Sequence, residues 1–135
     1  MKLFITLIFA SFLLPGCKKT IDKQKENIIM QAMTSGEWKI TSFITGGTNQ
    51  TAEFSGFSFR YYENRTVDAI RAGEVKTGTW QENVDKMDIS ANFPQASQPL
   101  PMVNGNWHIE QSSWTFVLAS QTTPAGYCEM RLEKL

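Results

Sequence analysis

The sequence is poor in the residues from which most metal and catalytic centres are built. Its 135 residues include two cysteines and a single histidine. Zinc sites need a cluster of such side chains, and a Ser-His-Asp triad needs a histidine in a cleft. His108 alternates with Trp107 and Ile109 in a strand-like run, so it faces solvent if they face inward. We therefore expect no metal, no cofactor and no enzymatic activity.

An excess of charge of one sign is also lacking. Lysine and arginine total 13, and aspartate and glutamate also total 13. A protein that binds nucleic acid gains much of its affinity from basic side chains on the phosphates. The balance predicts that nucleic acid is not a partner.

No apolar run is long enough to span a bilayer. The longest is at the N-terminus, where residues 3–14 follow the cation Lys2 and are apolar except for Thr6 and Ser11. A helix of that length rises about 18 Å, whereas the hydrocarbon core is about 30 Å thick. A cation followed by a short apolar stretch is typical of a secretory signal peptide. We expect residues 1–16 to be removed on export.

The apolar run ends in Leu14-Pro15-Gly16-Cys17, which resembles the lipobox of bacterial lipoproteins. In that family a diacylglycerol is attached to the cysteine thiol, and cleavage occurs directly before the cysteine. The resemblance implies that Cys17 is the lipid-bearing first residue of the mature protein. Two acyl chains of the palmitate type suffice for stable membrane anchoring. The alternative is an ordinary signal peptide that contains a cysteine.

A polar segment follows Cys17 and predicts a flexible tether. Residues 18–25 include four lysines and one aspartate. In some bacterial lipoproteins aspartate directly after the lipidated cysteine signals inner-membrane retention. Lys18 stands there in this sequence, so we expect the outer membrane. The predicted parts of the chain are a signal peptide (1–16), the lipidated cysteine with its tether (17–26) and one domain (27–135).

The second cysteine, Cys128, lacks an intramolecular partner if Cys17 carries lipid. It alternates with polar residues in a run that also contains Met130 and Leu132. We expect a buried thiol and no disulfide.

The pattern of residues in the domain predicts one short helix followed by strands. Apolar residues recur at helical spacing over 26–33. Short alternating runs then follow, separated by Gly, Asn, Pro and Ser. About eight antiparallel strands without intervening helices favour a closed up-and-down barrel, which leaves no exposed edge. Residues 92–104, with three prolines, are expected to be irregular. The predicted strands are 37–45, 54–62, 65–71, 74–82, 85–91, 105–111, 113–119 and 126–134.

Three short motifs extend this all-β interpretation. Gly36-Glu37-Trp38 opens the first predicted strand, Gly78-Thr79-Trp80 lies mid-chain, and Arg131-Leu132-Glu133-Lys134-Leu135 ends the sequence. With them the chain resembles lipocalin-like proteins, in particular the small lipocalin-like lipoproteins of Bacteroidetes. The resemblance implies a calyx that is closed near the Gly-x-Trp and open at its other end. It also implies a contact between Arg131 and Trp38, the alternative being that Arg131 faces solvent.

Aromatic residues dominate the predicted interior. An eight-stranded barrel is wide enough either to be filled by side chains or to hold one small ligand. A barrel with a cavity predicts binding of a small hydrophobic or amphipathic molecule. A barrel filled by side chains predicts a non-catalytic module that docks on another cell-envelope protein. Residues expected inward by period-two counting include Trp38, Ile40, Ser42, Ile44, Met87, Ile89, Ala91, Ile109 and Leu118. Candidate cavity-lining residues are Trp38, Phe57, Phe59, Tyr61, Trp80, Trp107, Trp114 and Phe116.

Overall fold

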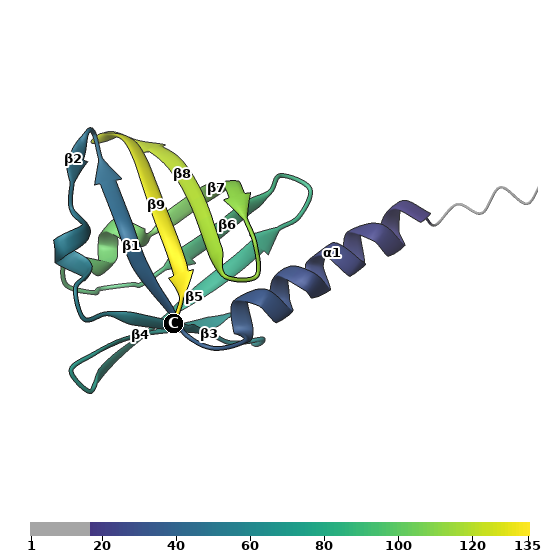
Figure 1. Ribbon diagram of the computed structural model, residues 1–135, viewed down its shortest axis with the longest axis horizontal. Coiled ribbons are helices and arrows are strands. Elements are labelled where there is room, and N and C mark those ends of the chain that lie inside the picture. The colour runs from purple at the N-terminus through teal and green to yellow at the C-terminus, as the bar shows by residue number, and fades with distance from the viewer. Residues whose placement is uncertain (1–16) are drawn as a thin grey trace, which may run out of the picture.

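A computed structural model describes residues 17–135, with side chains described from residue 23. The predicted signal peptide, residues 1–16, and the side chain of Cys17 lie outside what is described. A long helix precedes nine strands and two short 3-10 helices (Figure 1). In chain order they are α1 (Cys17–Thr34), β1 (Trp38–Thr45), β2 (Thr48–Asn49), η1 (Thr51–Phe54), β3 (Ser58–Tyr61), β4 (Thr66–Arg71), β5 (Glu74–Asn83), β6 (Asp88–Asn92), η2 (Leu100–Val103), β7 (Gly105–Ser112), β8 (Phe116–Thr123) and β9 (Gly126–Lys134).

The strands close into a barrel. From β3 to β9 each strand pairs antiparallel with the next, β3 also pairs with β1, and β9 returns to β1. The closing ladder is long, from Trp38 opposite Lys134 to Thr45 opposite Cys128. The short strand β2 pairs only with the end of β1. The predicted eight-stranded antiparallel barrel with an N-terminal helix is confirmed.

Tight turns account for the up-and-down order. Arg71 at the end of β4 pairs with Glu74 at the start of β5, which leaves a two-residue loop. Both loop residues have positive φ, 52° at Ala72 and 80° at Gly73. This is the backbone twist that matches the twist of the two strands, so the predicted hairpin forms there.

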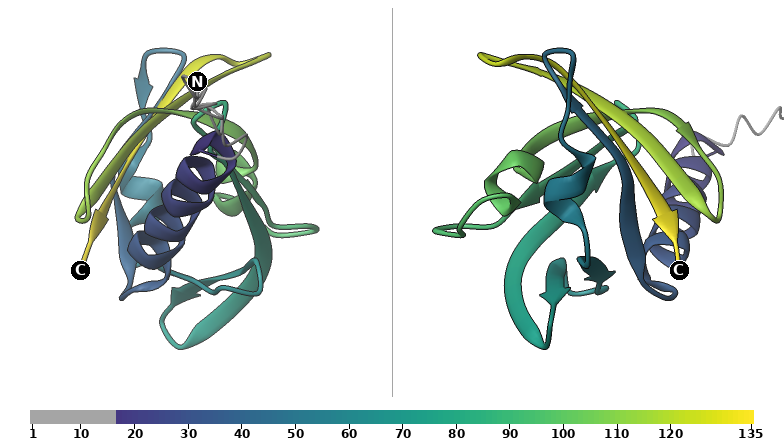
Figure 2. Two further views of the ribbon diagram at one scale, coloured as in Figure 1. Left: turned by 90° about the vertical axis from the view of Figure 1, so that its right-hand side faces the viewer. Right: turned by 60° about the vertical axis from the view of Figure 1, so that its left-hand side comes forward.

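The helix is longer than the sequence predicted. Residues 18–25, expected to be a flexible tether, belong to α1. They contain lysine and glutamine, which favour helix, and neither glycine nor proline. The C-terminal turns of α1 lie across one end of the barrel (Figure 2), and its N-terminal half projects away from it (Figure 1). Within residues 17–135, no helix is both long and apolar enough to cross a membrane.

A bulge in β1 overturns part of the predicted interior. Ile40 pairs with Leu132 but Ser42 pairs with Arg131, so Thr41 is an extra residue in the strand. Beyond it the faces exchange. Phe43 is therefore buried, at 1% exposure, while Ser42 and Ile44, which were expected to point inward, are only half-buried.

Further inward predictions fail at β8 and in the turns that precede β6 and β8. Trp114, expected within a strand, lies in the turn before β8 and is 53% exposed. The inward residues of β8 are Val117 and Ala119, so Phe116 and Leu118 are on its outer face. Met87, with a φ of 54°, is likewise exposed in the turn before β6.

The proline-containing segment between β6 and β7 covers the barrel end opposite α1. It contains η2 and buries three apolar side chains, those of Phe93, Leu100 and Val103. Asn104 fixes its base, because its side chain both accepts a hydrogen bond from the Phe93 amide and donates one to the Phe93 carbonyl. The segment is irregular, as predicted, and it closes this end of the core.

Candidate functional site

The barrel interior is filled by aromatic rings. The ring centroid of Phe43 lies 4.8 Å from that of Phe54 and 5.8 Å from that of Trp107. Phe59 is 6.4 Å from Phe93, and Tyr61 meets another ring, that of Trp80, edge-on at 5.4 Å. Such separations are those of packed aromatic pairs. These rings form a core, and burial raises the pKa of the Tyr61 hydroxyl above its ordinary value.

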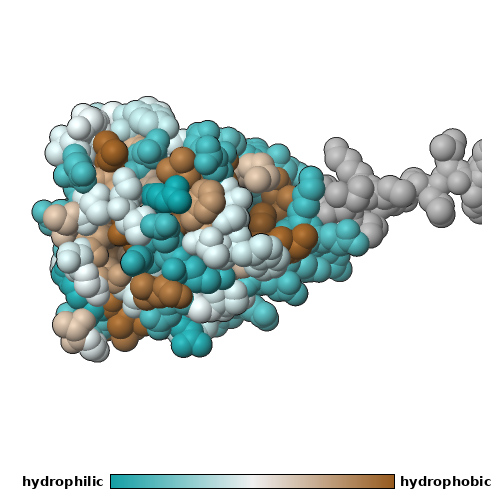
Figure 3. All heavy atoms as spheres, viewed as in Figure 1, coloured by the Kyte–Doolittle hydropathy of each residue, from teal (hydrophilic) through white to brown (hydrophobic). Residues whose placement is uncertain are grey.

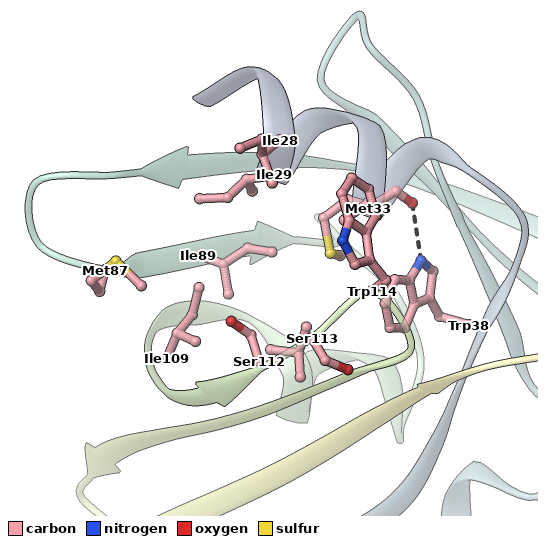
Figure 4. A pocket seen from close by; sticks show the side chains of 12 residues that line it. Ile28, Ile29, Met33, Trp38, Met87, Ile89, Ile109, Ser112, Ser113 and Trp114 are labelled. Carbon is pink, nitrogen blue, oxygen red and sulfur yellow. Dashed lines mark hydrogen bonds between the residues drawn. The ribbon is translucent and has the colours of Figure 1, made fainter. Parts of the chain in front are cut away.

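An apolar pocket of about 210 Å³ lies between α1 and the end of the barrel (Figure 4). The helix supplies one wall, and the strands and turns from β6 to β8 supply the other. Figure 3 shows hydrophobic atoms at the surface where α1 meets the barrel. The lining residues are Ile28, Ile29, Ala32, Met33, Trp38, Met87, Ile89, Ile109, Ser112, Ser113, Trp114 and Val117.

The rim of this pocket is unusually hydrophobic for a surface. Six large hydrophobic residues are exposed in residues 23–135, and three of them line the pocket: Ile28 at 52%, Met87 at 41% and Trp114 at 53%. Scattered exposed hydrophobic residues are ordinary, whereas a cluster beside a cavity marks a binding surface. The apolar pocket with its exposed rim is the best candidate site.

The predicted cavity-lining residues are dispersed. Trp38 and Trp114 line the pocket beneath α1. Phe57 lines a second, smaller pocket of about 170 Å³ at the opposite end, where the guanidinium of Arg71 lies 4.0 Å from its ring centroid. Trp80 borders a shallow groove but is buried. The core contains Phe59, Tyr61 and Trp107, and Phe116 is on the outer face.

The resemblance implied closure near Trp38, and the structure has Trp38 fully buried there, with its Nε1 donating to the Met33 carbonyl of the covering helix α1. The apolar pocket lies between this helix and the barrel, whereas Phe54, Phe93 and Leu100 are buried at the far end. The helical residues Ile28 and Ile29 were missed as site residues. Their helical spacing was visible, but which side of the barrel they cover depends on the fold.

The expected contact between Arg131 and Trp38 does not form. The Arg131 guanidinium lies 4.4 Å from the centroid of Phe116, and its Nη2 is 3.7 Å from Glu133. The cation over the Trp38 ring is that of Lys134, at 4.9 Å. Arg131 alternates with the inward residues Met130 and Leu132, and this parity directs it outward.

His108 faces outward, as its alternation with Trp107 predicted. Its Nδ1 is 3.1 Å from Asp88 Oδ1, and Asn106 Nδ2 donates to Asp88 Oδ2 at 2.9 Å. The hydrogen bond from Asn106, followed by that from His108, holds the pKa of Asp88 below its ordinary value. No group of three or more His, Cys, Asp or Glu side chains within the described residues is arranged to hold a metal ion.

Cys128 is buried at 4% exposure, as predicted for a structural thiol. Its sulfur lies 3.7 Å from the Thr123 hydroxyl and 3.7 Å from the Gly126 carbonyl oxygen. The thiol is enclosed between β8 and β9.

Comparison with known proteins points to one fold. A DUF4847 family protein from Bacteroides vulgatus aligns with a TM-score of 0.57 and 12% identity over 78% of this chain and 96% of its own. A lipocalin-like protein from Bacteroides uniformis aligns with a TM-score of 0.52 and 11% identity over 76% of this chain and 98% of its own. The fold is lipocalin-like. The likeness extends to Japanin from Rhipicephalus appendiculatus, described as bound to cholesterol, with a TM-score of 0.55 and 9% identity over 78% of each chain.

Sequence comparison assigns the chain to no family. No family model matches the chain. No curated protein matches it either. The lipocalin-like barrel and its resemblance to Bacteroides proteins therefore depend on the shape of the backbone and on the short motifs at Trp38 and Trp80.

Proposed function

We propose that this protein is a cell-envelope lipoprotein whose lipocalin-like barrel binds a small hydrophobic or amphipathic molecule and has no enzymatic activity. The observation that carries the proposal is the apolar pocket beneath α1, with Ile28, Met87 and Trp114 exposed at its rim. Concave apolar sites with few polar groups are the usual form of a small-molecule site. Japanin, of similar fold, is described as bound to cholesterol.

Binding is tested with protein purified from its native envelope. We expect organic extraction to yield a stoichiometric hydrophobic molecule, identifiable by mass spectrometry. Delipidated protein should rebind it with a change in tryptophan fluorescence, because Trp38 and Trp114 line the pocket. Delipidated protein that takes up no hydrophobic molecule contradicts the proposed binding.

The anchor is a separate part of the proposal. Cys17 would carry the acyl chains in the outer membrane, and α1, which begins at Cys17, would hold the barrel away from the lipid surface. Mass spectrometry of the mature N-terminal peptide tests the lipid. Cys17→Ser, exported with an ordinary cleavable signal peptide in place of residues 1–16, should be released from membranes on fractionation, and Cys128→Ser should stay attached. A membrane-bound Cys17→Ser protein without residues 1–16 contradicts the anchor.

A second candidate is an interaction module that docks on another envelope protein. The packed aromatic core favours it, because the ring contacts of Phe43, Phe59 and Trp107 leave the barrel centre filled. Crosslinking in intact cells tests it: recovery of one consistent partner, lost when residues 92–104 are shortened, supports docking over ligand binding.

A further inference from the structure

A buried carboxylate on β5 has one oxygen without a donor among the described residues. The side chain of Glu82, on β5, is 1% exposed, and its Oε1 is 2.7 Å from Nη2 of Arg65. Its Oε2 is also buried, and none of the described residues donates a hydrogen bond to it. Buried charged oxygens are almost always paired, because leaving one without a donor costs the full desolvation of that group. The oxygen therefore calls for a partner from outside the described chain.

The position of Glu82 associates this oxygen with the apolar pocket. Glu82 lies directly opposite Ile89 in the β5–β6 ladder, both side chains are buried, and Ile89 lines the pocket. Opposed side chains on one face of a sheet have Cβ atoms about 5 Å apart. The side chain of Glu82 therefore begins beside that of a residue that lines the pocket.

The ion pair contacts α1 through a flexible side chain. The guanidinium nitrogen Nη1 of Arg65 is 3.5 Å from Sδ of Met30, and the next helical residue, Ile29, lines the pocket. Methionine is unbranched and changes rotamer readily. A change of the Met30 rotamer would therefore alter the packing between the ion pair and α1 without moving the helix backbone.

We propose that the ligand of this pocket is a neutral amphiphile with a hydroxyl group, which donates its hydrogen bond to Glu82 Oε2 while the apolar part fills the pocket. The inference rests on the proposed ligand-binding function and specifies the ligand class. The Glu82–Arg65 pair is neutral as a whole, so a hydroxyl supplies the missing donor without adding charge. An ammonium would leave a net positive charge in a buried site, and a carboxylate would place a second anion beside Glu82.

The first test compares matched ligands on the wild-type protein, delipidated and full length. The probes are decan-1-ol, decan-2-one and decanoate, measured by titration calorimetry below their aggregation concentrations. The alcohol can donate, the ketone can only accept, and decanoate is an anion. A hydrogen bond to a charged acceptor predicts that decan-1-ol binds roughly ten times more tightly than decan-2-one, with decanoate the weakest.

The second test changes one atom of the site. In Glu82→Gln the amide oxygen stays with the Arg65 donor, so the amide nitrogen takes the position of Oε2. A donor then replaces the acceptor, and the preference for decan-1-ol over decan-2-one should disappear or reverse. Glu53→Gln, an exposed carboxylate on η1, is the matched control and should keep the wild-type ratio.

The outcomes separate the two levels of the proposal. If wild-type protein binds the alcohol and the ketone equally, or if Glu82→Gln keeps the wild-type ratio, the hydroxyl inference is overturned while ligand binding stands. If none of the three probes binds, both are overturned. If Glu82→Gln fails to fold, the ratio of the wild-type affinities for decan-1-ol and decan-2-one alone tests the hydroxyl inference.

Discussion

The ammonium nitrogen of Lys134 donates a 3.0 Å hydrogen bond to the carbonyl oxygen of Ala32, so the last strand of the barrel holds the last turns of the helix. The same nitrogen donates to Ser35 Oγ at 2.9 Å and lies 4.9 Å from the centre of the Trp38 ring. A cation is favourable there because the C-terminal end of a helix carries partial negative charge. Lys134 thereby fixes the helix that forms one wall of the apolar pocket.

Lys134→Met should loosen this attachment. The substitution keeps the aliphatic chain and removes the cation, its hydrogen bonds and its interaction with Trp38. We expect the free energy of unfolding to fall by about 1–2 kcal/mol. Amide exchange in the last turns of α1 should accelerate more than exchange in β7 and β8.

Arg131→Met is the matched control, because the Arg131 guanidinium lies over Phe116 and near Glu133 on the outer face of the barrel, away from α1. Partly exposed contacts of this kind contribute less than about 1 kcal/mol. Urea titrations of both variants give the comparison. A loss as large for Arg131→Met as for Lys134→Met would contradict the role given to Lys134.

The sequence was sufficient for the architecture because barrel closure depends on a repeated pattern. Alternation of apolar and polar residues, together with short turns such as that at Ala72 and Gly73, recurs along most of the chain. An error of a few residues in one strand leaves the count and the order of strands unchanged. The strand order and the antiparallel pairing were therefore predictable.

The site was less predictable because it depends on local irregularities and on tertiary packing. The extra residue Thr41 reverses the faces of β1 after Ile40, and no residue type at that point marks a bulge. Trp114 looks like a strand residue by composition, yet it occupies a turn. Ile28 lies over the barrel end because of the direction in which the chain turns between α1 and β1. Alternation along the strands does not predict that direction.

The bulge makes a direct prediction about neighbouring residues. Phe43→Ala should lower the free energy of unfolding by about 3–5 kcal/mol, because it removes a ring that packs on Phe54 and Trp107. Ile44→Ala, at a half-buried position, should lower it by only about 1–2 kcal/mol. Chemical denaturation of the two variants measures the difference. The reverse order would mean that β1 keeps strict alternation.

Gly78 in the Gly-x-Trp motif of β5 should tolerate no side chain. A Cβ there would clash with the carbonyl oxygen of Asn92 and would lie 2.8 Å from Cδ1 of Phe93. We expect Gly78→Ala to destabilise the protein by about 3 kcal/mol, since backbone and a buried ring would have to move.

Gly73→Ala provides the comparison for this steric effect. Gly73 has a φ of +80°, and no atom lies within 4 Å of a Cβ built on it. Gly73→Ala should therefore lower the free energy of unfolding only through backbone strain at positive φ, by about 1 kcal/mol. Thermal or urea unfolding measures the stability of the Gly78→Ala and Gly73→Ala proteins. Similar losses of unfolding free energy in both would argue against close contact between Gly78 and Asn92.

Asp88 should contribute to acid sensitivity. Its pKa is lowered in the folded protein, first by the hydrogen bond from Asn106. A carboxyl group with a depressed pKa stabilises the fold above its ordinary pKa of 3.8, and this stabilisation is lost as the pH falls through the lower, folded value. In Asn106→Ala the pKa of Asp88 should rise toward 3.8, and the loss of stability below pH 4 should become shallower. Carboxyl-carbon NMR titration measures the pKa, and Asn92→Ala, which leaves Asp88 untouched, should not change it.

Trp114 should contribute to ligand affinity more than to stability. Its ring is 53% exposed at the rim of the apolar pocket, so its burial depends on a ligand that covers it. Trp114→Ser removes that contact, and we expect about tenfold weaker binding of an alkyl alcohol with little change in unfolding free energy. Tyr127→Ser is the control, because Tyr127 is 54% exposed but lies away from this pocket, and its affinity should equal that of the wild type. Calorimetric titration of both variants with decan-1-ol decides the matter: equal affinities would place the ligand elsewhere than beneath α1.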